Sequence, residues 1–133
     1  MLDTRHPNFL RNVLWADAIA SGATGLVMVA GAGLLENLLG LPSALTREAG
    51  IILVPYAAFV AVVAARAHIS RAAVWVFIVA NAAWTIGSIA LLLGGLAPTA
   101  LGYAFVIAQA LVVAALAELQ YVGVRTSAPM QAG

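Results

Sequence analysis

The chain has no cysteine and no lysine, and only 8% of its 133 residues are charged. The absence of cysteine excludes disulfides, iron–sulfur clusters and thiolate zinc sites. All six basic residues are arginines scattered along the chain, and the formal net charge is +1. Proteins that bind nucleic acid gather their basic residues in a patch or stripe, so this distribution argues against a nucleic-acid partner.

Apolar residues are abundant where charged residues are few. They make up 64% of the chain, and the mean hydropathy is +1.05. Soluble domains carry roughly 25% charged residues, and a water-soluble core of this length cannot hide so much apolar surface. We therefore expect membrane lipid to be the solvent for much of the chain, whose length suits one domain.

Four apolar runs are long enough to cross a bilayer, which takes about 20 helical residues. They predict an all-α membrane protein with four transmembrane helices in an up-down antiparallel bundle, forming a single domain over residues 1–133. Gly40 and the pair Gly94-Gly95 predict helix ends, and Tyr56 is expected to help satisfy the backbone next to Pro55. The expected helices cover about residues 13–39, 43–65, 72–93 and 99–124, with a flexible tail at 126–133.

The arginines predict the orientation of this bundle. Arg47 is the one arginine expected on the outer side, and the other five fall before, between or after the helices on the opposite side: Arg5, Arg11, Arg66, Arg71 and Arg125. By the positive-inside rule, both termini are expected to be cytoplasmic. The N-terminal segment does not have the pattern of a secretory signal, because its apolar run is too long.

Polar side chains inside the expected spans form two stripes. Asp17, Ser21 and Thr24 are spaced by four and three residues, and so are Asn81, Thr85 and Ser88, so each set lies on one helix face. These stripes predict an intramembrane polar pocket. The candidate pocket residues are Asp17, Ser21, Thr24, Asn81, Trp84, Thr85, Ser88 and Gln109.

Asp17 has two interpretations. An ionised carboxylate at membrane depth costs roughly 2.5–3.5 kcal/mol unless it is paired or hydrated. It is either a proton- or cation-responsive acid in the pocket, or one half of an interfacial salt bridge to Arg11, Arg66 or Arg71. The functional interpretation predicts that Asp17→Asn changes ligand binding or proton coupling more than it changes folding.

The other intramembrane polar residues also have a structural and a functional interpretation. Asn81 either lines a pathway or joins helices through Gln109 or a backbone carbonyl. The Trp84 indole needs an acceptor and is a candidate pocket wall. Glu118 lies nine residues beyond Gln109 and therefore on the opposite side of its helix. The candidates for an ion pair at the cytoplasmic end are Glu118, Arg125, Arg71 and Arg66.

The sequence carries no pattern typical of catalysis. His6 and His68 fall outside the expected spans, which argues against a haem held between helices. We find no Ser/His/Asp set, phosphate-binding glycine loop or metal-ligand spacing. We therefore assign no catalytic, cofactor-binding or metal-binding residue and expect neither an enzyme nor a cofactor.

Several segments carry a resemblance to a known kind of protein: LWADAIASGATGLVMVAGAGLLENLLGLPSALTREAG, ILVPYAAF, NAAW at residues 81–84, and ALGYAFVIAQAL. They resemble small, uncharacterised bacterial four-helix integral membrane proteins, and the resemblance covers nearly all of the chain. It implies a multi-pass protein of the bacterial cytoplasmic (inner) membrane. It carries no activity, ligand or site residue.

Three classes of function follow. In the first, a homo-oligomer, most simply a dimer across helix 13–39 or helix 99–124, binds or passes a small molecule or ion through the polar pocket. In the second, the chain is a non-catalytic accessory or assembly subunit of a larger membrane complex. A membrane enzyme is the third. The first class predicts that the polar stripes converge on a cavity, and the second predicts that they satisfy each other with no cavity.

Overall fold

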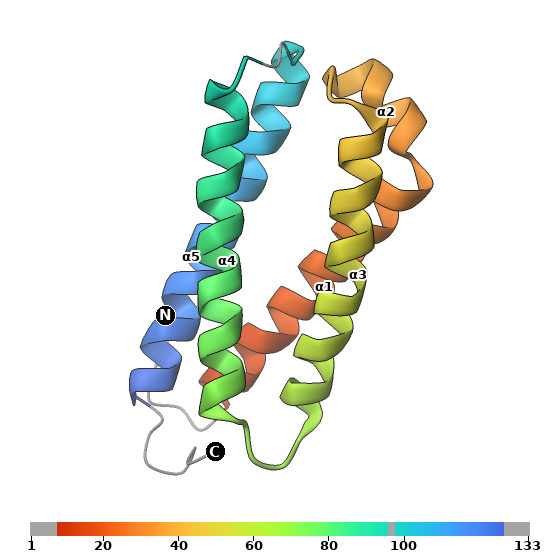
Figure 1. Cartoon of the computed structure of the whole chain (residues 1–133). Coiled ribbons are helices and arrows are strands. Elements are labelled where there is room, and N and C mark those ends of the chain that lie inside the picture. Colours follow the sequence, from red (N-terminus) through yellow and green to blue (C-terminus); the bar gives the residue numbers. More distant parts are fainter. Residues whose placement is uncertain (1–7, 96–97, 127–133) are drawn as a thin grey trace.

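The computed structural model describes residues 8–95 and 98–126, and within these ranges all the regular structure is helical. The helices are α1 (Phe9–Ala30), α2 (Ala32–Leu39), α3 (Ser43–Ala65), α4 (Arg71–Leu93) and α5 (Ala100–Thr126), shown in Figure 1. All of them except α2 are long and apolar enough to cross a membrane. The fold is that of a helical membrane protein.

The first predicted helix differs from the structure at its start and in its middle, whereas its end at Leu39 agrees. It begins at Phe9 rather than near residue 13, and it is broken at Gly31 into α1 and α2. The backbone of Gly31 has φ −109° and ψ 17°, outside the helical range, and glycine is a usual site of such breaks. Residues 1–7, which include His6, and most of the predicted tail, 127–133, lie outside the described residues.

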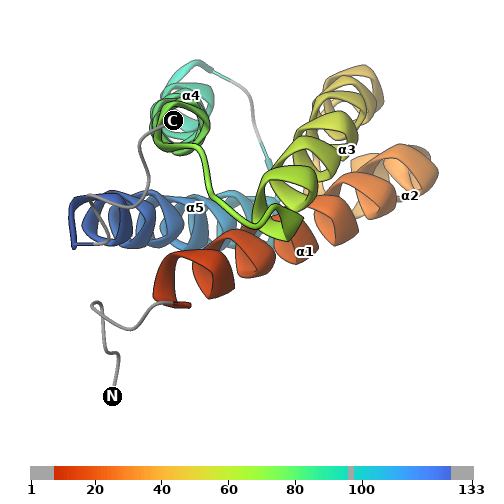
Figure 2. The ribbon, with the colours of Figure 1, turned by 90° about the horizontal axis from the view of Figure 1, so that it is seen from below.

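The long helices pack mainly as two pairs, α1 with α3 and α4 with α5, and α1 also lies against α5 (Figure 2). Glycines bring α1 and α3 close together. A Cβ at Gly50 would lie 2.8 Å from the carbonyl oxygen of Gly25, so the two backbones are nearly in contact at this point. Small residues allow this close approach, which is how many membrane helices associate.

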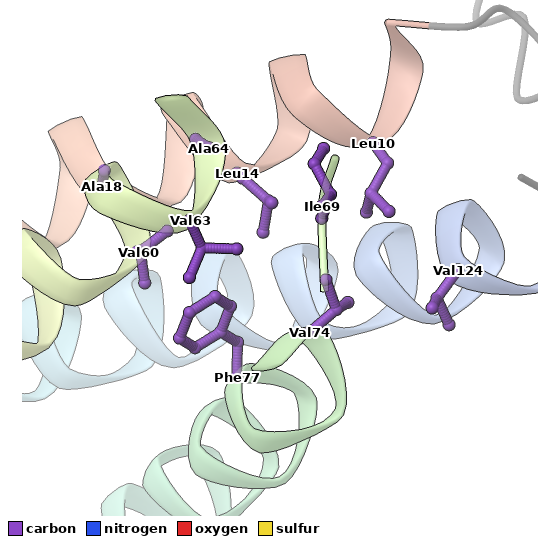
Figure 3. Close-up of a cluster of buried hydrophobic side chains, with 10 residues drawn as sticks. All are labelled: Leu10, Leu14, Ala18, Val60, Val63, Ala64, Ile69, Val74, Phe77 and Val124. Carbon is purple, nitrogen blue, oxygen red and sulfur yellow. The ribbon is translucent and has the colours of Figure 1, made fainter. Parts of the chain in front are cut away.

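The start of α1 and the end of α5 lie at the same end of the molecule, which we call the terminal end. Here a hydrophobic cluster joins all four long helices (Figure 3). Phe77 of α4 is fully buried in it, and its ring packs edge-on against Tyr56 and Phe59 of α3, with centroids 5.7 and 5.1 Å apart. The buried members are Leu10, Leu14, Ala18, Val60, Val63, Ala64, Ile69, Val74, Phe77 and Val124.

Two arginines form hydrogen bonds between the helices of each pair at the terminal end. The guanidinium of Arg11 donates to the backbone carbonyls of Ala64 and Arg66, the second at 2.6 Å, where α3 ends. Arg71 donates to the carbonyl of Val124 at 2.6 Å, near the end of α5. The last carbonyls of a helix have no partner within it, so these contacts satisfy them and hold α1 to α3 and α4 to α5.

At the opposite end, which we call the loop end, α2 packs against the start of α5. The Thr99 amide donates to the carbonyl of Leu39 at 3.0 Å, and its hydroxyl donates to the carbonyl of Leu38 at 2.7 Å. Leu39 also packs with Val106. Gly102 permits this approach, because a Cβ there would overlap the Leu39 carbonyl. The α3 and α4 helices diverge towards this end (Figure 1).

Candidate functional site

Asp17 is the centre of a polar network between the two helix pairs. Its side chain is fully buried, and its carboxylate accepts four hydrogen bonds. Ser21 donates to Oδ1 at 2.9 Å. Tyr56, Asn81 and Gln120 donate to Oδ2 at 2.8, 3.1 and 2.6 Å. We call these five residues the Asp17 network; each of the four long helices contributes to it.

The members of this network also satisfy each other. The Asn81 amide nitrogen donates a second hydrogen bond to the Gln120 side-chain oxygen at 3.0 Å. The Tyr56 hydroxyl lies 3.2 Å from the Asn81 side-chain oxygen, so Asn81 and Asp17 share its single proton. A buried polar network is favourable only when its members are partnered. This arrangement explains how a carboxylate is tolerated inside an apolar bundle.

The network argues against one of the two interpretations of Asp17, the salt bridge to an arginine. The arginines predicted as salt-bridge partners bind elsewhere: Arg11 and Arg71 donate to backbone carbonyls, and Arg66 is exposed. Neutral donors from four helices hold the acid instead. The side chain of Asp17 is fully buried between the helices.

Two members of the network, Tyr56 and Gln120, were not among the pocket residues predicted from the sequence. Gln120 follows Gln109 by 11 residues, which at about 100° per residue is three turns plus about 20°. The two glutamines therefore share a helix face, a signal present in the sequence. Tyr56 was considered only as a partner for the backbone near Pro55, although a phenol inside a membrane span is itself a candidate partner for an acid.

A second polar cluster, the indole cluster of Trp84, Ser88 and Gln109, joins α4 to α5. The Trp84 indole donates to the Gln109 side-chain oxygen at 2.7 Å. The Gln109 nitrogen donates to the Ser88 hydroxyl and to the Val106 carbonyl, both at 2.9 Å. Gln109 therefore accepts a hydrogen bond from the Trp84 indole and donates one to Ser88. Asn81, which was expected to be a partner of Gln109, instead forms its hydrogen bonds within the Asp17 network.

A cavity of about 740 Å³ lies next to both clusters and is lined by all four long helices. Its walls are mainly apolar, for example Leu53 of α3, Leu91 of α4 and Val113 of α5. Small-molecule sites have volumes of roughly 300–1,000 Å³ and combine apolar walls with a few polar groups. The size and composition of this cavity fit that description.

Hydroxyl groups in the cavity wall differ in their hydrogen bonding. Ser21 donates to Asp17, Ser88 donates to the Trp84 carbonyl at 2.8 Å, and Thr46 is 3.3 Å from the carbonyl four residues before it. Thr24 is half-buried in the same wall, and its hydroxyl has no hydrogen-bond partner within residues 8–95 and 98–126. It offers the cavity both a donor and an acceptor.

The remaining pocket candidate, Thr85, has a structural role. Its hydroxyl donates to the Asn81 carbonyl one turn earlier, at 2.9 Å. Threonines in the middle of a helix commonly form this hydrogen bond to the backbone. Two of the pocket candidates, Asp17 and Thr85, do not line the cavity. The other six do: Ser21, Thr24, Asn81, Trp84, Ser88 and Gln109.

The ion pairs predicted for Glu118 do not form between described residues. Glu118 is exposed, and Arg125 lies over the ring of Tyr121, 5.3 Å from its centroid. Glu118 and Arg125 share a face but are seven residues apart, about 10.5 Å along the helix, which favours the nearer aromatic ring. Arg71, the other predicted partner, is bound to the Val124 carbonyl.

No group of three or more histidine, aspartate and glutamate side chains in the described part of the chain could hold a metal ion. His68 is exposed in the connection between α3 and α4. The Asp17 network is made of one acid, one phenol, one hydroxyl and two amides, all bonded to each other. These hydrogen bonds are made within the network, so they join the four long helices to one another.

Comparison with known proteins gives no match: no family model fits the sequence, and no curated protein and no solved structure is significantly similar to it.

Proposed function

We propose that this protein binds a small, neutral and mainly apolar molecule inside the membrane, in the cavity between its four long helices. The observation that supports this function is the cavity of about 740 Å³, whose apolar walls include a few hydrogen-bonding side chains. Helix bundles form their ligand sites in this way, from side chains on facing helices.

The surroundings of Asp17 favour a neutral ligand over an ion. The carboxylate is fully buried and already accepts four hydrogen bonds, so it is not free to act as a counter-charge in the cavity. A cation at membrane depth is costly without such a partner. Passage of ions is therefore a weaker proposal than binding of an uncharged molecule.

An accessory or assembly subunit of a larger complex is the alternative. It predicts polar stripes that satisfy each other with no cavity between them. Asp17, Asn81 and Gln109 are indeed satisfied by neighbouring helices. The cavity beside them supports the binding function, because a purely structural network would be packed against apolar side chains.

We further propose the setting in which this bundle acts. It is an up-down antiparallel bundle in a bacterial cytoplasmic membrane, with both termini on the cytoplasmic side and a dimer contact across α1 or α5. Five of the six arginines fall at the predicted cytoplasmic positions. The start of α1 and the end of α5 lie at one end of the molecule, as this topology requires.

Filling the cavity tests the proposed function. A Cβ at Gly87, in the cavity wall, would meet no atom within 4 Å, and the same holds for Gly33 on α2, outside the cavity. Gly87→Leu therefore fills the cavity, and Gly33→Leu is the matched control. The readout is the fluorescence of Trp84 in a protein that also carries Trp15→Phe and Trp75→Phe, titrated with a medium-chain brominated methyl ketone.

We expect saturable quenching of Trp84 in the parent protein and in Gly33→Leu. The leucine side chain of Gly87→Leu takes up cavity volume that the ligand needs, so the apparent affinity is expected to fall about tenfold. Native mass spectrometry of the same samples reports the bound mass and the number of chains. Quenching that does not saturate, or equal affinities for the two leucine variants, would contradict the proposed function.

A further inference from the structure

We propose that the ligand carries an acceptor oxygen, such as a carbonyl oxygen, which binds the Thr24 hydroxyl within the membrane, and a hydrocarbon part that lies against the apolar cavity walls. The ligand class is thus a neutral, mainly hydrocarbon carbonyl compound that fits a cavity of about 740 Å³. This inference rests on the proposed function and adds the chemistry of the ligand and the side chain that binds it.

The hydrogen bonding of the cavity wall points to Thr24. Serine and threonine in helices commonly donate to the carbonyl four residues earlier. Ser88 does so in α4, and Thr46 lies near the corresponding carbonyl in α3. Thr24 has the same option towards Ala20, yet its hydroxyl makes no hydrogen bond to the described residues. A hydroxyl without a partner is unfavourable in an apolar medium, so a ligand oxygen at this position is stabilised.

The depth of Thr24 limits which oxygen can reach it. It follows Phe9, the first residue of α1, by 15 residues, and precedes Ala30, the last, by 6. At about 1.5 Å per residue these separations are about 22 and 9 Å. The hydrocarbon core is about 30 Å thick, with the polar headgroups outside it. An oxygen bound to Thr24 therefore lies well below the headgroups, unlike the ester oxygens of a phospholipid.

The position of Thr24 in the cavity agrees with this ligand. Thr24 follows Asp17 by seven residues, about 10.5 Å along α1, so it lies between the Asp17 network and the loop end. The cavity wall is mainly apolar, and Leu53, Leu91 and Phe105 belong to it. The ligand oxygen therefore fits at Thr24, and its hydrocarbon part fits against these apolar residues.

The test compares two probes and two variants of Thr24, again with Trp84 as the fluorescent reporter. The probes are the medium-chain brominated methyl ketone and the brominated alkane of the same length. Since a hydrogen bond contributes about 0.5–1.5 kcal/mol, the ketone is expected to bind the parent protein about three- to tenfold more tightly than the alkane. Thr24→Val should abolish this difference by weakening binding of the ketone alone. Thr24→Ser keeps the hydroxyl and should keep the difference between the two probes.

Alkane binding to Thr24→Val serves as the control for folding, because an intact cavity still binds the alkane. Unchanged ketone affinity in Thr24→Val, or an equal loss for both probes, would overturn the inference. Thr24-dependent quenching by a brominated phosphatidylcholine that is stronger than quenching by the ketone would overturn the proposed ligand class. In each of these cases Gly87→Leu is still expected to weaken binding of the alkane. Failure of the inference can therefore be distinguished from failure of the proposed function.

Discussion

The four long helices of this protein form two different environments, a filled one near the terminal end and a hollow one towards the loop end. Near the terminal end, Phe77 packs against Tyr56 and Phe59, and the Asp17 carboxylate accepts four hydrogen bonds. Towards the loop end the same helices line a cavity in which the hydroxyl of Thr24 lacks a partner among the described residues. Polar side chains in a membrane are therefore structural where they are mutually satisfied, and available for binding where they are not.

The largest expected effect comes from removing the centre of the filled region. Asp17→Ala leaves the Tyr56, Asn81 and Gln120 donors without their acceptor, and each buried unsatisfied group costs about 1–3 kcal/mol. We expect the free energy of unfolding in mixed detergent micelles to fall by about 3 kcal/mol or more. Glu118→Ala, at an exposed acid, is the control.

This prediction revises the expectation from the sequence that Asp17→Asn changes binding more than folding. An asparagine has one acceptor oxygen, and its amide group would face donors, so Asp17→Asn should also destabilise the protein. If Asp17→Ala and Glu118→Ala unfold with the same free energy, the Asp17 network does not stabilise the fold.

An intermediate effect is expected at the loop end, where α2 meets α5. Gly102→Ala places a Cβ against the Leu39 carbonyl, so the backbones must separate, and overpacking of this kind costs about 1–3 kcal/mol. Thermal unfolding followed by circular dichroism measures the loss. Gly33→Ala, which enters open space, should leave the melting temperature unchanged. Equal melting temperatures for the two variants would contradict the close packing of α2 on α5.

The smallest effect on stability is expected at Thr24. Its hydroxyl makes no hydrogen bond within the described residues, so Thr24→Val should change the free energy of unfolding by less than about 0.5 kcal/mol. Ser21→Ala, one turn earlier, removes a hydrogen bond to Asp17 and should cost about 1 kcal/mol. A loss for Thr24→Val as large as that for Ser21→Ala would mean that Thr24 belongs to the filled region.

Much of the architecture follows from the sequence alone, because its causes are local. Runs of about 20 apolar residues predicted the four long helices, and hydropathy needs no knowledge of neighbours. Gly40 ends α2 in the left-handed conformation, with φ 71°, and Gly94 follows the last residue of α4, as expected. For Asn81 the sequence left two interpretations open, lining a pathway or joining helices, and the structure shows it buried and bonded to Asp17 and Gln120.

Tertiary structure alone decided which polar groups meet. Gln120 is 103 residues from Asp17 in the chain, and the contact depends on how α1 and α5 are rotated about their axes where they cross. Helical spacing shows which side chains share a face, but the packing of α1 against α3 and of α4 against α5 determines what each face meets. The same packing leaves the cavity, because α3 and α4 are in contact at Phe77 and diverge beyond it, a geometry that no local pattern encodes.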